Sequence, residues 1–163
     1  MKGKEDKESM KIGLAGEYLV AGMLSIKGWY ASLTLKNYPG IDIIAHKVGE
    51  KNSLRWIQVK STKGQSSILV GRLKRGATEE DVRSKIVKGD YILVVFDKKV
   101  NESPNVYPDY YIVPMNDMVQ LVLRTNEDYF NKKHEKEVAE TQPVAIKVKS
   151  LEPYKDRWDL LDE

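Results

Sequence analysis

Apolar residues recur at helical spacing near the start of the chain. They form one stripe: Ile12, Ala15, Leu19, Met23 and Ile26. This spacing predicts an amphipathic helix over residues 10–27. Gly28 follows directly, at a position where helices commonly stop. The charged residues 1–10 carry no apolar pattern, so we expect them to be a frayed tail.

The pattern then changes to short extended segments. Residues 29–35, 41–46 and 54–62 are rich in aromatic and β-branched side chains and are separated by turn residues. The first turn, residues 37–40, contains Pro and Gly, which adopt the dihedral angles that a chain reversal needs. Short strands joined by tight turns predict an antiparallel meander.

The second half of the chain predicts a buried strand between helices. Thr78 is a suitable helix N-cap, since Glu79, Glu80 and Asp81 follow it in the first turn. Residues 91–96 are continuously apolar, as in a central strand buried on both faces. The later elements expected are a strand at 110–113, a short helix at 115–123, an edge strand at 144–148 and a terminal helix from 153. Residues 63–77 are ambiguous, with a short strand possible at 66–70.

These elements, in the order α-β-β-β-α-β, predict an α/β fold with a mixed central β-sheet flanked by helices. A length of 163 residues fits a single domain, with residues 11–97 as its core and 98–163 as a C-terminal elaboration. No apolar run is long enough for a transmembrane helix, and the N-terminus lacks the pattern of a secretory signal. Cysteine is absent, which excludes disulfides and thiol catalysis and suits a cytoplasmic protein. A net charge of +3 permits a local basic surface.

Three polar residues on the predicted meander could form a site. Gln58 and Lys60 are two residues apart on a strand, so they share one face, with Ile57 and Val59 on the opposite, buried face. The turn before this strand is centred near residue 50 or 51, and antiparallel pairing therefore places Asp42 opposite residues 58–60. A carboxylate, an amide and an ammonium would thus lie within reach of one another.

This combination suits a divalent metal and phosphodiester hydrolysis. Mg²⁺ (or Mn²⁺) prefers oxygen ligands and retains waters, and Asp42 would be the main ligand. The Gln58 amide oxygen and the Val59 carbonyl could supply neutral ligands. Lys60 could orient or deprotonate the attacking water, or stabilise charge on the phosphate.

The order of elements and three motifs resemble the PD-(D/E)XK nuclease superfamily, in its restriction-endonuclease-like and archaeal Holliday-junction-resolvase-like branches. The motifs are Gly16-Glu17, Pro39-Gly40-Ile41-Asp42 and Gln58-Val59-Lys60-Ser61-Thr62. The resemblance covers residues 11–97. It implies a restriction-endonuclease-like core, a metal-dependent DNA endonuclease with Glu17 as a helical catalytic carboxylate, and a possible homodimer. The chain departs from the pattern at Gln58, where most members carry Glu or Asp, and the lost charge should weaken Mg²⁺ binding.

A basic cluster follows the last motif: Lys63, Arg72, Lys74 and Arg75. These side chains could contact phosphates beside the scissile bond, which would position nucleic acid without reading its sequence. They could equally belong to a solvated loop. The other candidates also have ordinary interpretations, since Asp42 could be a polar residue beside a turn and Glu17 an exposed helix residue.

Three functions remain open from the sequence. The first is a metal-dependent DNA endonuclease. The second is a catalytically inactive nucleic-acid-binding module on the same fold, for which the neutral Gln58 is the main argument. The third is a structural or regulatory domain without a nucleic-acid partner.

Overall fold

The computed structural model describes residues 2–35, 40–51, 53–102, 105–132 and 140–163, with side chains from residue 7 onward. A five-stranded mixed sheet forms the centre, in the order β1-β2-β3-β5-β6. Its strands are β1 (Trp29–Leu33), β2 (Ile43–Lys47), β3 (Arg55–Lys63), β5 (Asp90–Phe96) and β6 (Asp109–Val113). The predicted turn at 37–40, with Pro39, lies outside the described residues except for Gly40.

The first three strands form the predicted antiparallel meander. Ile43 pairs with Ile57, so the register places Asp42 beside residue 58, as expected. β5 lies parallel to β3 and antiparallel to β6, which makes the sheet mixed. Tyr91, Ile92, Leu93 and Val94 of β5 are all fully buried. The apolar run therefore forms the predicted central strand, because both of its faces are covered.

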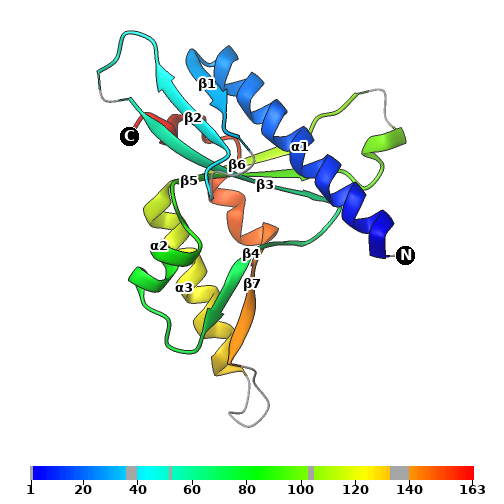
Figure 1. Cartoon of the computed structure of the whole chain (residues 1–163), viewed down its shortest axis with the longest axis vertical. Helices are drawn as coiled ribbons and strands as arrows, with labels where there is room; N and C mark the ends of the chain where they lie inside the picture. The colour runs from blue at the N-terminus through cyan, green and yellow to red at the C-terminus, as the bar shows by residue number, and fades with distance from the viewer. Residues whose placement is uncertain (1, 36–39, 52, 103–104, 133–139) are drawn as a thin grey trace.

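Helix α1 (Lys2–Ile26) covers one face of the sheet (Figure 1). It begins at Lys2, so residues 2–10, which were expected to belong to a frayed tail, are helical. Val20 and Leu24 are fully buried against the sheet, and Gly16 lies on the same stripe one turn earlier. Ile26 is 80% exposed, so its assignment to the apolar face was wrong. It follows Leu24 by two residues, which rotates it about 200° around the helix.

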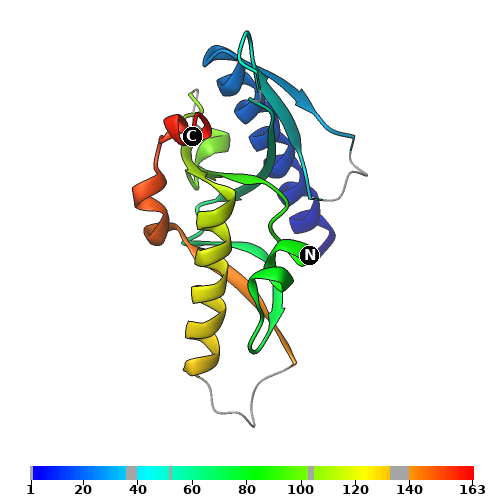
Figure 2. The same cartoon turned by 90° about the vertical axis from the view of Figure 1, so that its left-hand side faces the viewer.

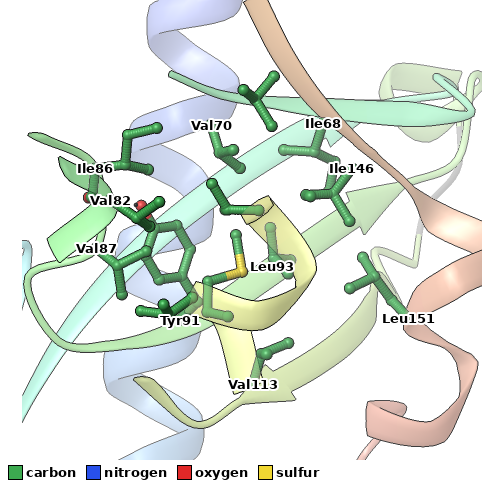
Figure 3. Packing of buried hydrophobic residues seen from close by; sticks show 14 of the residues in the cluster. Ile68, Val70, Val82, Ile86, Val87, Tyr91, Leu93, Val113, Ile146 and Leu151 are labelled. Carbon is green, nitrogen blue, oxygen red and sulfur yellow. Dashed lines mark hydrogen bonds between the residues drawn. The ribbon is translucent and has the colours of Figure 1, made fainter. Parts of the chain in front are cut away.

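The other face is covered by a second layer. It contains a two-stranded antiparallel ribbon, β4 (Ser67–Lys74) with β7 (Thr141–Lys147), and the helices α2 (Glu79–Lys85) and α3 (Met115–Asn131). Figure 2 shows α3 running along this ribbon. Apolar side chains from the ribbon, both helices and β5 form one core cluster (Figure 3). α3 is longer than the expected short helix, since its buried stripe continues to Asn126 and Phe130.

Helix α2 begins where the sequence predicted. The Thr78 side chain accepts a hydrogen bond from the Asp81 backbone N–H at 3.2 Å, and an Asp81 carboxylate oxygen accepts from the Thr78 N–H at 3.0 Å. This capping box satisfies two backbone donors that the helix itself leaves unpaired. The Thr78 hydrogen bond, followed by Lys85, lowers the pKa of Asp81 to about 2.

The last third of the chain completes both sheets. β6 joins the central sheet and β7 joins the ribbon. The expected terminal helix is instead two short 3₁₀ helices, η3 (Val148–Tyr154) and η4 (Trp158–Leu161), and another, η1 (Val100–Glu102), follows β5. Trp158 and Leu161 are buried in the cluster beneath α1, so these two residues of the C-terminal third belong to the core. No helix among the described residues has the length and apolar character needed to cross a membrane.

Candidate active site

The site lies where β3 continues beyond its pairing with β2. β2 pairs with β3 only as far as Ile57, so over residues 59–63 the described structure pairs β3 with β5 alone. A cavity of about 840 Å³ opens along this free edge. α1 forms one wall, with Glu17 on it, and the beginning of β4 forms another. Five predicted site residues therefore line one cavity: Glu17 on α1, Asp42 immediately before β2, and Val59, Lys60 and Lys63 on β3.

Asp42 is held in place by both its backbone and its side chain. Its N–H donates to the Ile57 carbonyl at 2.9 Å, and its carbonyl accepts from the Thr34 N–H at 2.9 Å. Its Oδ2 accepts a hydrogen bond from the Val59 N–H at 2.7 Å. The carboxylate thus replaces the missing β2 partner of β3. Within the described part of the chain, the other oxygen, Oδ1, has no hydrogen-bond partner.

Lys60 and Lys63 differ in their ionic partners. The Lys63 ammonium forms an ion pair with Glu8 of α1 at 2.9 Å. Lys60 forms no ion pair with any residue that the structure describes. Both side chains line the cavity, but the charge of Lys60 is the one that is not compensated by a carboxylate at bonding distance.

Gly16 allows α1 to lie close to β3 beside the cavity. A Cβ atom at this position would lie 1.9 Å from Ser61 Oγ and 3.1 Å from Ser61 Cβ. Any side chain on residue 16 would therefore require Ser61 to shift or the helix to move away from the strand. Glu17 is the next residue, so the contact at Gly16 also determines how far Glu17 lies from β3. Ser61 Oγ is buried and has no hydrogen-bond partner among the described residues.

Gln58 does not line the cavity and is 7% exposed. In the orientation that satisfies its neighbours, its amide nitrogen lies 3.1 Å from the carbonyl oxygens of Gly40 and Ile86 and 2.9 Å from the Tyr91 hydroxyl. The Tyr91 hydroxyl in turn donates to the Ile86 carbonyl at 3.0 Å. Gln58 therefore connects the residues before Asp42 to the end of α2. The sequence predicted an open face for Gln58, but both faces of β3 are covered at this point.

The surroundings of Gln58 also determine the protonation of the Tyr91 hydroxyl. Burial raises the pKa of the Tyr91 hydroxyl, and the nearby Asp42 carboxylate adds to the effect. The hydroxyl therefore stays protonated and can act as the donor to Ile86. Gly40 contributes its carbonyl to these surroundings, and its φ of +78° lies in the region that favours glycine.

The oxygen donors at the cavity fit a weakly held divalent metal such as Mg²⁺. They include the carboxylates of Asp42 and Glu17. The Val59 carbonyl is a third donor, because it points to the same free edge of β3 as the Val59 N–H. The described residues contain no group of three or more His, Cys, Asp or Glu that could hold a metal. Mg²⁺ commonly binds through one or two carboxylates and completes its shell with waters and substrate phosphates.

The structure divides the predicted basic cluster. Lys63 lines the cavity, whereas Arg72, Lys74 and Arg75 do not. Arg72 and Lys74 are exposed on β4, which runs away from the central sheet in Figure 1. The Arg75 guanidinium lies over the Phe130 ring, 4.9 Å from its centre, so Arg75 packs on the end of α3.

Sequence reasoning missed several residues at the cavity, namely Glu8, Ser61, Gln65 and Lys98. Glu8 was assigned to the tail, and its role depends on the first turns of α1 being helical. Lys98 reaches the cavity past Gly64, where a Cβ atom would lie 2.1 Å from Lys98 Cγ. For Lys98, the sequence signals were Gly64 directly after β3 and the lysine itself shortly after β5.

Comparisons with known proteins bear on the fold. Neither a protein-family model nor a curated protein matches the sequence. Among solved structures, the chain is similar to a bacterial homing endonuclease, I-Ssp6803I, with a TM-score of 0.51 and 14% sequence identity. The alignment covers 94% of this chain and 92% of that chain. The predicted fold class, a mixed central sheet flanked by helices, is confirmed, and a nuclease shares this fold.

Proposed function

We propose that this chain is a metal-dependent DNA endonuclease with a PD-(D/E)XK type of site. One observation carries the proposal: the Asp42 carboxylate is anchored to the Val59 N–H at 2.7 Å and lines the same cavity as Lys60. A fixed carboxylate beside an uncompensated ammonium suits the hydrolysis of a phosphodiester. The shared fold with a homing endonuclease supports the same activity and DNA as the substrate.

Asp42 would be the principal ligand of Mg²⁺ or Mn²⁺, with the Val59 carbonyl as a neutral ligand. Glu17, on the opposite wall, would act through water. When bound, such an ion acidifies a water molecule and neutralises charge on the phosphate. Gln58, first predicted to be a ligand, would act indirectly by holding the residues before Asp42.

Lys60 would act on the attacking water and the phosphate. Its Nζ can donate hydrogen bonds to phosphate oxygens, and in its neutral form it can accept a proton from the water. Because Lys60 follows Val59 directly, the hydrogen bond that fixes Asp42 also fixes the backbone next to Lys60. The Asp42 carboxylate and the backbone that carries Lys60 are thereby held in one arrangement before substrate binds.

A second function, an inactive nucleic-acid-binding module, is favoured by a separate observation. Gln58 is neutral and its amide is occupied by carbonyl partners within the protein. The described residues also lack a group of three potential metal-binding side chains. A cavity with so few charged ligands could bind phosphate without cleaving it.

Cleavage and binding assays separate these functions. Purified protein is incubated with duplex, branched and single-stranded DNAs in Mg²⁺ or Mn²⁺, and again in EDTA. Cleavage that requires the metal supports the endonuclease. Binding at low salt without cleavage in either metal supports the binding module. Absence of binding to every DNA at low salt contradicts both, because phosphate contacts are strongest under that condition.

A further inference from the structure

The β4–β7 ribbon has two faces of opposite character. Ile68, Val70 and Leu73 of β4 and Val144 and Ile146 of β7 point into the core, where Figure 3 shows several of them. The other face carries Leu69, Arg72 and Lys74 opposite Ala145, Pro143 and Thr141, and Ser67 opposite Lys147. Arg72, Lys74 and Lys147 are exposed. This second set is called the outer face below.

A bulge places the cations on the outer face. The pairing register of β4 shifts between Leu69 and Gly71. Without the shift, strict alternation from Ile68 would turn Arg72 and Lys74 inward. Gly71 lies beside the shift and packs closely against Ile86, since a Cβ atom at this position would lie 2.7 Å from Ile86 Cδ1. The backbone is therefore arranged so that Leu73 is buried and both neighbouring cations face outward.

The ribbon strands are basic. Neither β4 (SILVGRLK) nor β7 (TQPVAIK) contains Asp or Glu, and their cations are Arg72, Lys74 and Lys147. Lys74 lies 4.0 Å from Asp81, whose carboxylate is already bound by Thr78 and by Lys85 at 3.0 Å. This surface is therefore complementary to a polyanion.

Arg72 is positioned by the opposite strand. Its Nη2 donates to the Thr141 carbonyl at 3.1 Å, which holds the guanidinium across the ribbon. A guanidinium has five N–H donors, so others remain for a ligand. Arg75 and Lys63 differ, since one packs over an aromatic ring and the other is paired with Glu8.

The outer face continues into the cavity. Leu69 is 60% exposed on the outer face and also lines the cavity beside Lys60. From Leu69 to Lys74 the strand spans about 16 Å at its usual rise. That length corresponds to about five base-pair steps of DNA. A duplex with its scissile phosphate at the cavity could therefore reach all three cations.

We propose that the outer face of the β4–β7 ribbon binds duplex DNA, entering the major groove next to the scissile phosphate. The inference rests on the proposed function, since it places the duplex relative to the cavity. A two-stranded ribbon fits the width of the major groove. Arg72, Lys74 and Lys147 contact phosphates along that groove, and Arg75 is excluded from the contact.

The test is the salt dependence of binding to a fluorescent duplex, measured by anisotropy in EDTA so that cleavage cannot occur. The ribbon variant is Arg72→Gln, Lys74→Gln and Lys147→Gln. The matched control, Lys27→Gln, Lys51→Gln and Lys155→Gln, removes three charges from outside the ribbon. Circular dichroism and thermal melting establish that both are folded, and Lys147→Glu alone provides a second ribbon variant if the triple variant is unfolded.

We expect the ribbon variant to bind more weakly, and its salt slope to fall by about 0.9 for each phosphate that it no longer neutralises. The control should keep the wild-type slope. Lys147→Glu should also lower the affinity. If wild-type protein binds duplex and the ribbon variant has an unchanged slope, or if the control weakens as much, the ribbon proposal is overturned while the endonuclease proposal stands. If wild-type protein binds no DNA, the endonuclease proposal fails and the ribbon proposal fails with it.

Discussion

The Asp42 side chain has two roles at the cavity, one in the fold and one in the proposed binding of a metal. Its Oδ2 accepts from the Val59 N–H, which stabilises the free edge of β3, and its charge is available to a cation. An alanine at this position would remove both roles at once. Asparagine separates them, because its side-chain oxygen can still accept the hydrogen bond.

Asp42→Asn should abolish metal-dependent cleavage and leave the fold intact. Metal affinity depends on the charge of the ligands, and this substitution removes the principal charge. DNA binding should be retained or tightened, since the repulsion between carboxylate and phosphate disappears. Cleavage in Mg²⁺, binding in EDTA and circular dichroism test the three statements. Cleavage by the variant at the wild-type rate would show that the site lies elsewhere.

Lys60→Ala should slow cleavage by about 10²–10⁴-fold, the usual range for lost proton transfer or charge stabilisation. The metal concentration that gives half-maximal activity should not change, because Lys60 is not a ligand. Lys63→Ala is the matched control, since Lys63 lines the same cavity but is paired with Glu8. Single-turnover rates of the two variants should differ. An equal loss of cleavage rate in both variants would show that Lys60 contributes only a general positive charge to the cavity.

Gln58→Glu should destabilise the protein by about 1–3 kcal/mol, the cost of leaving buried polar groups unpaired. The amide nitrogen lies 3.1 Å from two carbonyl oxygens, and an ionised glutamate has no hydrogen to donate to them. Urea unfolding measures the loss, with the exposed Gln65→Glu as control. A variant as stable as wild type that binds Mg²⁺ more tightly would instead restore the interpretation of Gln58 as a ligand position.

At the scale of elements, the packing of α1 on β3 shapes the cavity. The helix contributes Glu8 and Glu17 to the walls, and both depend on the close approach at Gly16. The hydrophobic pattern of α1 predicted an apolar face but placed its centre one residue away, since Val20 and Leu24, which are fully buried, lie beside the predicted stripe.

Gly16→Ala should destabilise the protein by about 1–3 kcal/mol, because the added methyl group overpacks the contact with Ser61. Gly22→Ala on the same helix is the matched control. A Cβ atom there meets no other atom within 4 Å, so the substitution should stabilise α1 by up to about 1 kcal/mol. Adding Ser61→Ala to Gly16→Ala should restore part of the loss. Similar effects of the two glycine substitutions in urea unfolding would contradict the proposed contact.

At the scale of the whole molecule, the two ends of the chain support each other. Trp158 and Leu161 of η4 are buried in the cluster that lies beneath α1. The Trp158 ring centre lies 5.3 Å from that of Tyr110 on β6, and the Lys27 ammonium lies over the same ring. The end of the chain therefore stabilises the layer on which the cavity wall is built.

Trp158→Ala should lower the free energy of unfolding by about 3 kcal/mol, as expected for removing a large buried aromatic side chain. Activity per folded molecule should change little, since Trp158 does not line the cavity. Tyr107→Ala is the control, because Tyr107 is 85% exposed and its loss should cost less than about 0.5 kcal/mol. Equal melting temperatures for the two variants would contradict this role of η4.

Local patterns along the chain were enough for much of the fold. The meander, the start of α2 at Thr78 and the buried strand β5 were predicted, since periodicity, capping and continuous apolar runs depend on neighbours in sequence. The position of Asp42 next to residues 58–60 was also predicted, because an antiparallel turn fixes the register of both strands, and Ile43 pairs with Ile57.

Other features were decided only by tertiary structure. Gln58 is buried and bonded within the protein because the end of α2 and Tyr91 cover that face of β3. The ion pair between Glu8 and Lys63 joins residues 55 positions apart. The outward direction of Arg72 and Lys74 depends on a bulge and on a partner strand that follows about 70 residues later. A local pattern indicates which face of a helix or strand is buried. A cavity is formed by elements that are distant in sequence, and the contacts between them cannot be predicted from a local pattern.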